Sequence, residues 1–120
     1  MKNARLGAVE ARFADIIWNN APLTTAALID LCKTEFDWKR TTTYTVLKRL
    51  SDRGIFKNEN GTVTPLISRE EFYSLQSEEV VSESFGGSLP AFIAAFTSRR
   101  DLTDGEIAEI QSIIEKIKRG

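Results

Sequence analysis

The pattern of apolar and polar positions is most informative in residues 39–54, which read KRTTTYTVLKRLSDRG. At helical spacing this stretch has a packing side and a polar side. The packing side consists of Thr43, Val46, Leu47 and Leu50. The polar side gathers cations and hydroxyls: Arg40, Thr41, Tyr44, Thr45, Lys48 and Arg49. The pattern predicts an amphipathic helix that ends at Gly54, where a left-handed position favours glycine.

Helix propensity does not explain the threonines in this stretch, because β-branched side chains lose rotamer freedom in a helix. Short hydroxyls interleaved with cations at the start of a helix suit close approach to a phosphate backbone and to base edges. A solvated polar face is the simpler interpretation, and taken alone the stretch favours it. The neighbouring elements reverse that preference.

Two further helices are predicted before this stretch. Residues 6–19 place Val9, Phe13, Ile16 and Ile17 at helical spacing, and Pro22 follows. Leu23 can form a very short strand before Thr24 or Thr25 caps a second helix. Trp38 is expected to be a core anchor at the turn between the second and third helices. A helix, a short turn and a helix with a basic N-terminal half are typical of a helix-turn-helix.

After Gly54 the pattern changes from helical to extended. Residues 55–57 and 62–64 are short β segments on either side of a turn that contains Asn60-Gly61. Asn-Gly is the strongest local signal for a β-hairpin. The hairpin is a candidate wing, and Lys57 at its base could contact phosphate.

The last fifty residues are predicted to be helical and unusually apolar. Ser68–Glu71 and Thr103–Glu106 match capping boxes, and Gly86-Gly87 marks a break between helices. An apolar stripe runs through Phe85, Leu89, Phe92, Ile93, Phe96, Ile107, Ile110, Ile113, Ile114 and Ile117. Burying one such side chain stabilises by roughly 1.5–3 kcal/mol, so the stripe needs a partner surface. That partner is either the first domain or the same stripe of a second copy, and we favour the two-fold dimer.

Charge is distributed unevenly along the 120 residues, whose net charge is only −1. Residues 1–32 are neutral, residues 33–57 carry +4 and residues 58–120 carry −5. The positive excess is centred on residues 39–54, as expected for a local electrostatic footprint on nucleic acid.

Composition argues against an enzyme and against a metal site. The chain has no histidine and one cysteine, Cys32, which is expected in the core rather than as a reactive thiol. No Gly-rich phosphate loop or nucleophile elbow occurs. No cofactor is expected. The absence of a long apolar run predicts a cytoplasmic protein without membrane insertion.

Several short motifs match a known family over nearly the whole chain. They are Ile16-Ile17-Trp18, Trp38, Thr42 with Thr45, Leu47, Arg49-Leu50, Gly54, Pro65-Leu66-Ile67-Ser68, Phe85-Gly86-Gly87, Asp101-Leu102-Thr103 and Glu106-Ile107. With these motifs the chain resembles the bacterial penicillinase and methicillin-resistance repressors, which are grouped with the copper-transport repressors. The resemblance implies an N-terminal winged helix that binds promoter DNA and C-terminal helices through which two subunits intertwine.

The resemblance also implies a route of release. In antibiotic-responsive members, a membrane sensor protease or its signalling route leads to cleavage of an Asn-Phe bond in the C-terminal helices. The matching bond here is Ala95–Phe96, which keeps the phenylalanine and lacks the asparagine. Copper-responsive members carry a C-terminal cysteine cluster, which this chain lacks.

The sequence thus predicts a mainly α protein with a small β wing: a winged helix-turn-helix domain in residues 1–69 and a helical dimerisation region in residues 70–120. Operator DNA, a second copy and a sensor protease pathway are the expected partners. Base edges would be contacted by Arg40, Thr41, Tyr44, Thr45 and Lys48, and phosphates by Thr42, Arg49 and Lys57. The alternative is a winged helix that acts as a protein adaptor without binding DNA.

Overall fold

A computed structural model describes residues 4–120, which form two compact units. The first ends at Val80 and the second comprises Val81–Gly120. Helix α4 (Arg69–Phe85) begins in the first unit and ends in the second. The predicted division between residues 69 and 70 separates a DNA-binding domain from a dimerisation region, and it stays a prediction. Residues 1–3 of the predicted DNA-binding domain lie outside the described residues.

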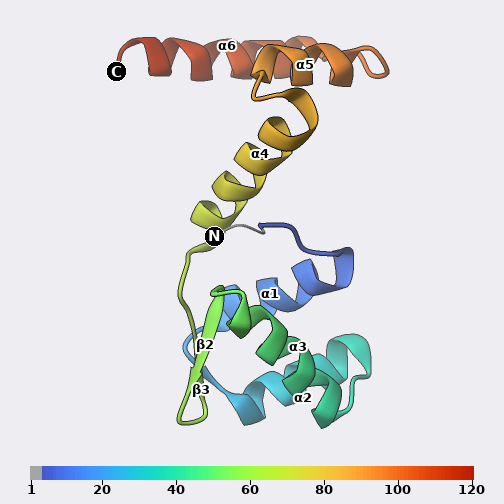
Figure 1. Ribbon diagram of the computed structural model, residues 1–120, viewed down its shortest axis with the longest axis vertical. Coiled ribbons are helices and arrows are strands. Elements are labelled where there is room, and N and C mark those ends of the chain that lie inside the picture. Colours follow the sequence, from blue (N-terminus) through green and yellow to red (C-terminus); the bar gives the residue numbers. More distant parts are fainter. Residues whose placement is uncertain (1–3) are drawn as a thin grey trace. The chain divides into compact units, whose positions relative to one another are not determined.

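The first unit is a winged helix-turn-helix, which confirms the predicted fold class (Figure 1). Its elements are α1 (Ala8–Asn20), β1 (Leu23–Thr24), α2 (Thr25–Phe36), α3 (Arg40–Asp52), β2 (Phe56–Glu59), β3 (Thr62–Pro65) and the start of α4. The sheet is antiparallel with strand order β1-β3-β2. Leu23 pairs with Val63, and Asn58 pairs with Val63 from the other side.

Local chemistry sets the ends of these elements. The Thr24 hydroxyl accepts the N–H of Ala27 at 3.0 Å and caps α2. Helix α3 closes with Gly54 at φ 81°, where the N–H of Gly54 donates to Ser51 O and that of Ile55 donates to Leu50 O. These two bonds form a Schellman motif, which explains the glycine.

The hairpin turns at Asn60 (φ 54°) and Gly61 (φ 82°). Two successive residues with positive φ form the two-residue turn that matches the twist of paired strands. The predicted wing is therefore present, and its strands are longer than predicted.

The core of the first unit contains side chains from every helix and strand. The largest fully buried ones include Phe13, Ile17, Leu28, Leu50, Phe56, Val63 and Phe72. Trp38 packs against this core and stacks on Phe36 with ring centroids 4.5 Å apart. Val9 is 47% exposed, contrary to the packed position predicted for it, because it lies in the first turn of α1, whereas the part of α1 that is buried in the core is Phe13, Ala14 and Ile17.

The second unit contains the end of α4, α5 (Leu89–Thr97) and α6 (Asp104–Lys118). Ser88 caps α5, and Thr103 with Glu106 forms the predicted capping box of α6. Neither α5 nor α6 has a buried residue. Among residues 4–120, no helix combines the length and apolar character needed to cross a bilayer.

Candidate nucleic-acid interface

Helix α3 has the two faces that its sequence predicts. Thr43, Val46, Leu47 and Leu50 are buried in the core of the first unit. The opposite face is open: Arg40, Thr41, Thr42, Thr45, Lys48 and Arg49 are exposed and Tyr44 is half-buried. The cationic face of the predicted recognition helix is therefore free to approach a ligand.

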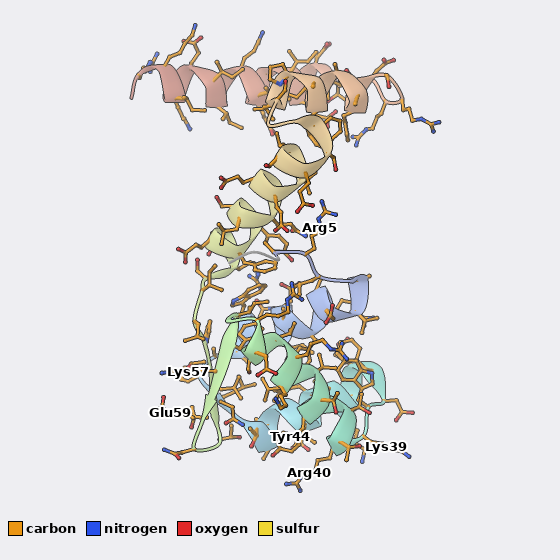
Figure 2. All side chains as sticks on the ribbon, in the orientation of Figure 1. Arg5, Lys39, Arg40, Tyr44, Lys57 and Glu59 are labelled. Carbon is orange, nitrogen blue, oxygen red and sulfur yellow. The ribbon has the colours of Figure 1, made fainter. Side chains whose placement is uncertain are left out.

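The N-terminal end of α3 carries an arginine stacked on a tyrosine (Figure 2). The Arg40 guanidinium lies 5.6 Å from the centroid of the Tyr44 ring. Hydrogen bonding to the Thr25 side chain, and then to Arg40, lowers the pKa of the Tyr44 hydroxyl. Thr25 also donates its backbone N–H to Gly61 O at 3.0 Å, so it connects α2, α3 and the wing turn. The sequence alone gave no sign of this role for Thr25.

The threonines of α3 divide into two groups. Thr43 is buried, donates its hydroxyl to Lys39 O at 3.3 Å and hydrogen-bonds the Cys32 side chain, so it serves the core. Thr45 donates its hydroxyl to Thr41 O at 2.9 Å on the exposed face. That hydroxyl keeps its acceptor lone pairs available for a base or a solvent molecule.

Two cations of α3 have carboxylate partners. Lys48 Nζ lies 3.0 Å from Asp52 Oδ2, one helical turn away. Arg49 Nη1 lies 3.3 Å from Glu10 Oε2, while Glu10 Oε1 accepts the backbone N–H of Gly7. Glu10 thus connects the start of α1 to the exposed edge of α3. Exposed pairs of this kind contribute about 0–1 kcal/mol, so phosphate can replace the carboxylate at small cost.

The wing adds a third such pair. Lys57 Nζ lies 2.9 Å from Glu59 Oε2, and this hydrogen bond and charge lower the pKa of the Glu59 carboxyl. Between α3 and β2, a hollow of about 190 Å³ is lined by Tyr44, Leu47, Lys48, Ser51 and Asn58. The exposed face of α3 and the wing therefore form one continuous surface.

The residues predicted for dimerisation lie in the second unit. Leu89, Ile93, Phe96, Ile107, Ile113, Ile114 and Ile117 are exposed, whereas Phe85, Phe92 and Ile110 are half-buried. Phe85 and Phe92 meet edge to face with centroids 5.4 Å apart. A cavity of about 270 Å³ is lined by Leu89, Phe92, Ile93, Phe96, Thr97, Leu102, Glu106 and Ile110. Five predicted dimerisation residues are thus gathered around one apolar hollow.

The Ala95–Phe96 bond lies inside α5, close to its end at Thr97. Both residues are exposed, and Phe96 has the Arg100 guanidinium 5.5 Å from its ring centroid. A protease would need the last turns of α5 to open before this bond could enter its active site.

Comparison with known proteins shows which family the chain resembles. The model of the penicillinase repressor family matches residues 6–116. The chain belongs to the penicillinase repressor family. Its similarity to individual relatives is distant: a penicillinase repressor of Bacillus licheniformis is 26% identical over 98% of this chain and 94% of the relative. A methicillin resistance regulatory protein MecI of Staphylococcus aureus is 23% identical over 96% of this chain and 97% of the relative.

Among solved structures, the multiple antibiotic-resistance repressor MarR of Listeria monocytogenes has a TM-score of 0.47 and 14% identity. The match covers 95% of this chain and 73% of that chain. The resemblance to penicillinase and methicillin-resistance repressors is confirmed by the family match and by the two curated relatives, which are a regulatory protein and a repressor rather than enzymes.

Proposed function

We propose that this member of the penicillinase repressor family, a DNA-binding transcriptional repressor, acts as a homodimer on a palindromic promoter site. The observation that carries the proposal is the division of α3 into a buried apolar face and an open cationic face. Such a helix, preceded by a short turn and followed by a wing, suits entry into the major groove.

In this proposal, Arg40, Thr41, Tyr44, Thr45 and Lys48 read base edges. Thr42, Arg49 and Lys57 lie at the rim and contact phosphates. Arg40 is the strongest candidate for a base contact, because among the described residues it has an aromatic platform and no carboxylate partner within 4.0 Å. A guanidinium held in one plane can bond a guanine edge through two N–H groups.

The three ion-paired cations have a different part in binding. When DNA binds, Lys48 exchanges its carboxylate partner for a base edge, whereas Arg49 and Lys57 exchange theirs for phosphates. Asp52, Glu10 and Glu59 then remain close to the duplex. Their negative charge weakens attachment to DNA that offers no base contacts, because phosphate attraction dominates such binding.

The second unit supplies the dimer. Its apolar stripe surrounds a hollow that a side chain of a second copy could fill, and α5 and α6 have no buried residue of their own. A two-fold dimer presents two α3 helices to two half-sites in inverted orientation. Packing of the stripe against the first domain of the same chain is the competing arrangement.

Release from DNA would follow from any signal that separates the two copies. Cleavage at Ala95–Phe96 is one such signal, since it would divide α5 and remove Phe96 from the helix that carries Leu89 and Phe92. The agent would be a protease activated through a membrane sensor pathway, as in the antibiotic-responsive relatives implied by the resemblance.

A titration and a selection test the proposal. The protein is first titrated against random duplex DNA at two salt concentrations, where affinity should fall steeply as salt rises. Fragments of the host genome are then selected by binding, and an inverted repeat should be enriched. A protein adaptor would show no salt-dependent association, and that result would overturn the proposal.

A further inference from the structure

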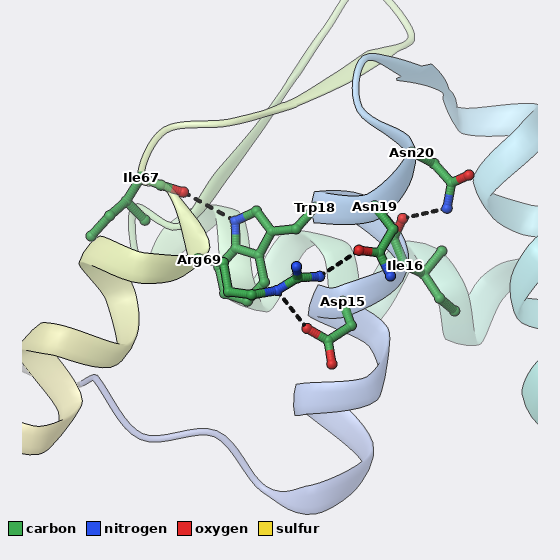
Figure 3. Close-up of polar contacts among 7 residues, drawn as sticks. All are labelled: Asp15, Ile16, Trp18, Asn19, Asn20, Ile67 and Arg69. Carbon is green, nitrogen blue, oxygen red and sulfur yellow. Dashed lines mark hydrogen bonds and ion pairs between the residues drawn. The ribbon is translucent and has the colours of Figure 1, made fainter. Parts of the chain in front are cut away.

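A cluster of polar and aromatic contacts joins the first turn of α4 to the C-terminal half of α1 (Figure 3). Arg69 Nε donates to Asp15 Oδ1 at 3.1 Å, and Arg69 Nη2 donates to Asn19 Oδ1 at 2.6 Å. The same guanidinium lies 5.7 Å from the Trp18 ring centroid, and the Trp18 indole N–H donates to Ile67 O at 3.1 Å. We call Asp15, Trp18, Asn19 and Arg69 the Arg69 clamp.

Packing extends these contacts along α4. Phe72 is fully buried with its ring centroid 5.7 Å from that of Trp18, and the Tyr73 ring lies 6.1 Å from Trp18. Further along, Glu79 Oε2 accepts the backbone N–H of Ala4 at 2.7 Å. Helix α4 is therefore fastened to the first unit at its start, after one turn and again near Val80.

We propose that the Arg69 clamp makes α4 a rigid extension of the winged unit and thereby sets the half-site spacing that a dimer accepts. The inference rests on the proposed function, because spacing has meaning only for two copies on one duplex. Arg69 is a positioning residue here and contacts no DNA. Its planar fork reaches two acceptors four residues apart on α1, which fixes both tilt and rotation.

Leverage explains why the base of α4 matters. The helix has 17 residues, which corresponds to a length of about 25 Å. A tilt of about 20° at its start would move its far end by about 9 Å, whereas successive base pairs are separated by about 3.4 Å. A loose attachment at the base of α4 would therefore admit more half-site spacings than a clamped one.

The first experiment measures the clamp without DNA. In Arg69→Met, the backbone amides of residues 72–79, which begin with the Phe72 N–H bonded to Ser68 O, should exchange with solvent about tenfold faster than in the unmodified protein. This is the effect expected when the hydrogen bonds of a charged side chain are lost. Arg12→Met is the matched control, because Arg12 pairs with Glu35 at 3.1 Å and lies over Phe36, so it joins α1 to α2 instead. Equal exchange in the two variants would overturn the clamp.

The second experiment measures spacing. Duplexes with random sequence are selected by the unmodified protein, Arg69→Met and Arg12→Met. We expect one dominant spacing for the unmodified protein and the control, and at least three neighbouring spacings with the same half-site sequence for Arg69→Met. An unchanged single spacing in Arg69→Met would overturn the inference.

Two further results keep this inference separate from the proposed function. If the unmodified protein enriches no inverted repeat, the two-fold operator is wrong, whereas amide exchange still decides whether the clamp holds α4. If Arg69→Met fails to fold by near-ultraviolet circular dichroism, Asp15→Asn replaces it, since that change removes the charge and preserves the shape.

Discussion

The two units of this protein place their apolar side chains in opposite ways. Phe72 on α4 is fully buried in the first unit, whereas Phe96 on α5 is 42% exposed in the second. The first unit buries phenylalanines from α1, β2 and α4 in one core. In the second unit, α5 and α6 bury nothing completely and expose seven large apolar side chains: Leu89, Ile93, Phe96, Ile107, Ile113, Ile114 and Ile117.

This difference separates two sources of stability. A closed core stabilises a single chain, whereas an open apolar stripe gains stability only when another surface covers it. Under our proposal the two units also have different functions. The first unit, with its closed core, presents cations to DNA, and the second unit, with its open apolar stripe, holds two copies together.

Core truncation should have the largest effect. Phe72→Ala is expected to lower the free energy of unfolding by about 3–5 kcal/mol, whether the protein is dilute or concentrated. Phe96→Ala should have little effect in dilute, monomeric protein and a clear effect in concentrated protein. Urea unfolding followed by tryptophan fluorescence at two protein concentrations measures both variants. The same concentration dependence in both would contradict the comparison.

A charge in the apolar stripe should disrupt self-association next. Phe92→Asp is expected to weaken the dimer by at least about 100-fold, because it removes a large apolar contact and buries a carboxylate. Sedimentation measures the change. Val9→Asp is the matched control, since Val9 is an apolar side chain that is 47% exposed in the first unit. Dimers of equal strength in both variants would show that the stripe has another partner.

The reactivity of the buried Cys32 thiol reports on the first unit alone. Burial raises the pKa of Cys32 from 9.0 to about 11, while a hydrogen bond with Thr43 opposes the rise. At pH 8 the thiolate fraction should be about 100-fold below that of the unfolded chain, so a disulfide reagent should react slowly. Phe92→Asp should leave this rate unchanged, because it acts in the other unit. Rapid reaction in either protein would argue against a closed first unit.

The same thiol predicts a direction for stability against pH. The folded pKa is raised, so the unfolded chain releases the thiol proton first as pH increases. The contribution of Cys32 to the free energy of unfolding should therefore be fully present below pH 9, and it should be lost as the pH rises from 9 to about 11. Cys32→Val should remove this part of the loss, which unfolding curves at several pH values would measure.

The smallest effect concerns single phosphate contacts. Arg49→Ala should reduce the salt dependence of DNA binding by about one unit of slope. Lys116→Ala on α6 removes the same charge from the other unit and should leave the slope unchanged. Titrations at four salt concentrations separate the two variants. Equal slopes would remove Arg49 from the phosphate contacts.

Features that depend on neighbours along the chain could be predicted from the residues alone. Thr103 and Glu106 cap α6 within three residues, Asn60-Gly61 turns the hairpin, and Gly54 closes α3. The periodicity of α3 also predicted its buried side, including Thr43. Each of these features follows from backbone conformation or from the helical repeat, which local residue types control.

The contacts between residues far apart in the chain could not be predicted and became apparent in the folded protein. Arg49 pairs with Glu10 across 39 positions, Trp18 bonds Ile67 across 49, and Arg69 bonds Asp15 across 54. The tertiary structure also leaves Val9 exposed. A helical pattern gives the direction of each face but not which surface will cover it, because that depends on how whole elements pack.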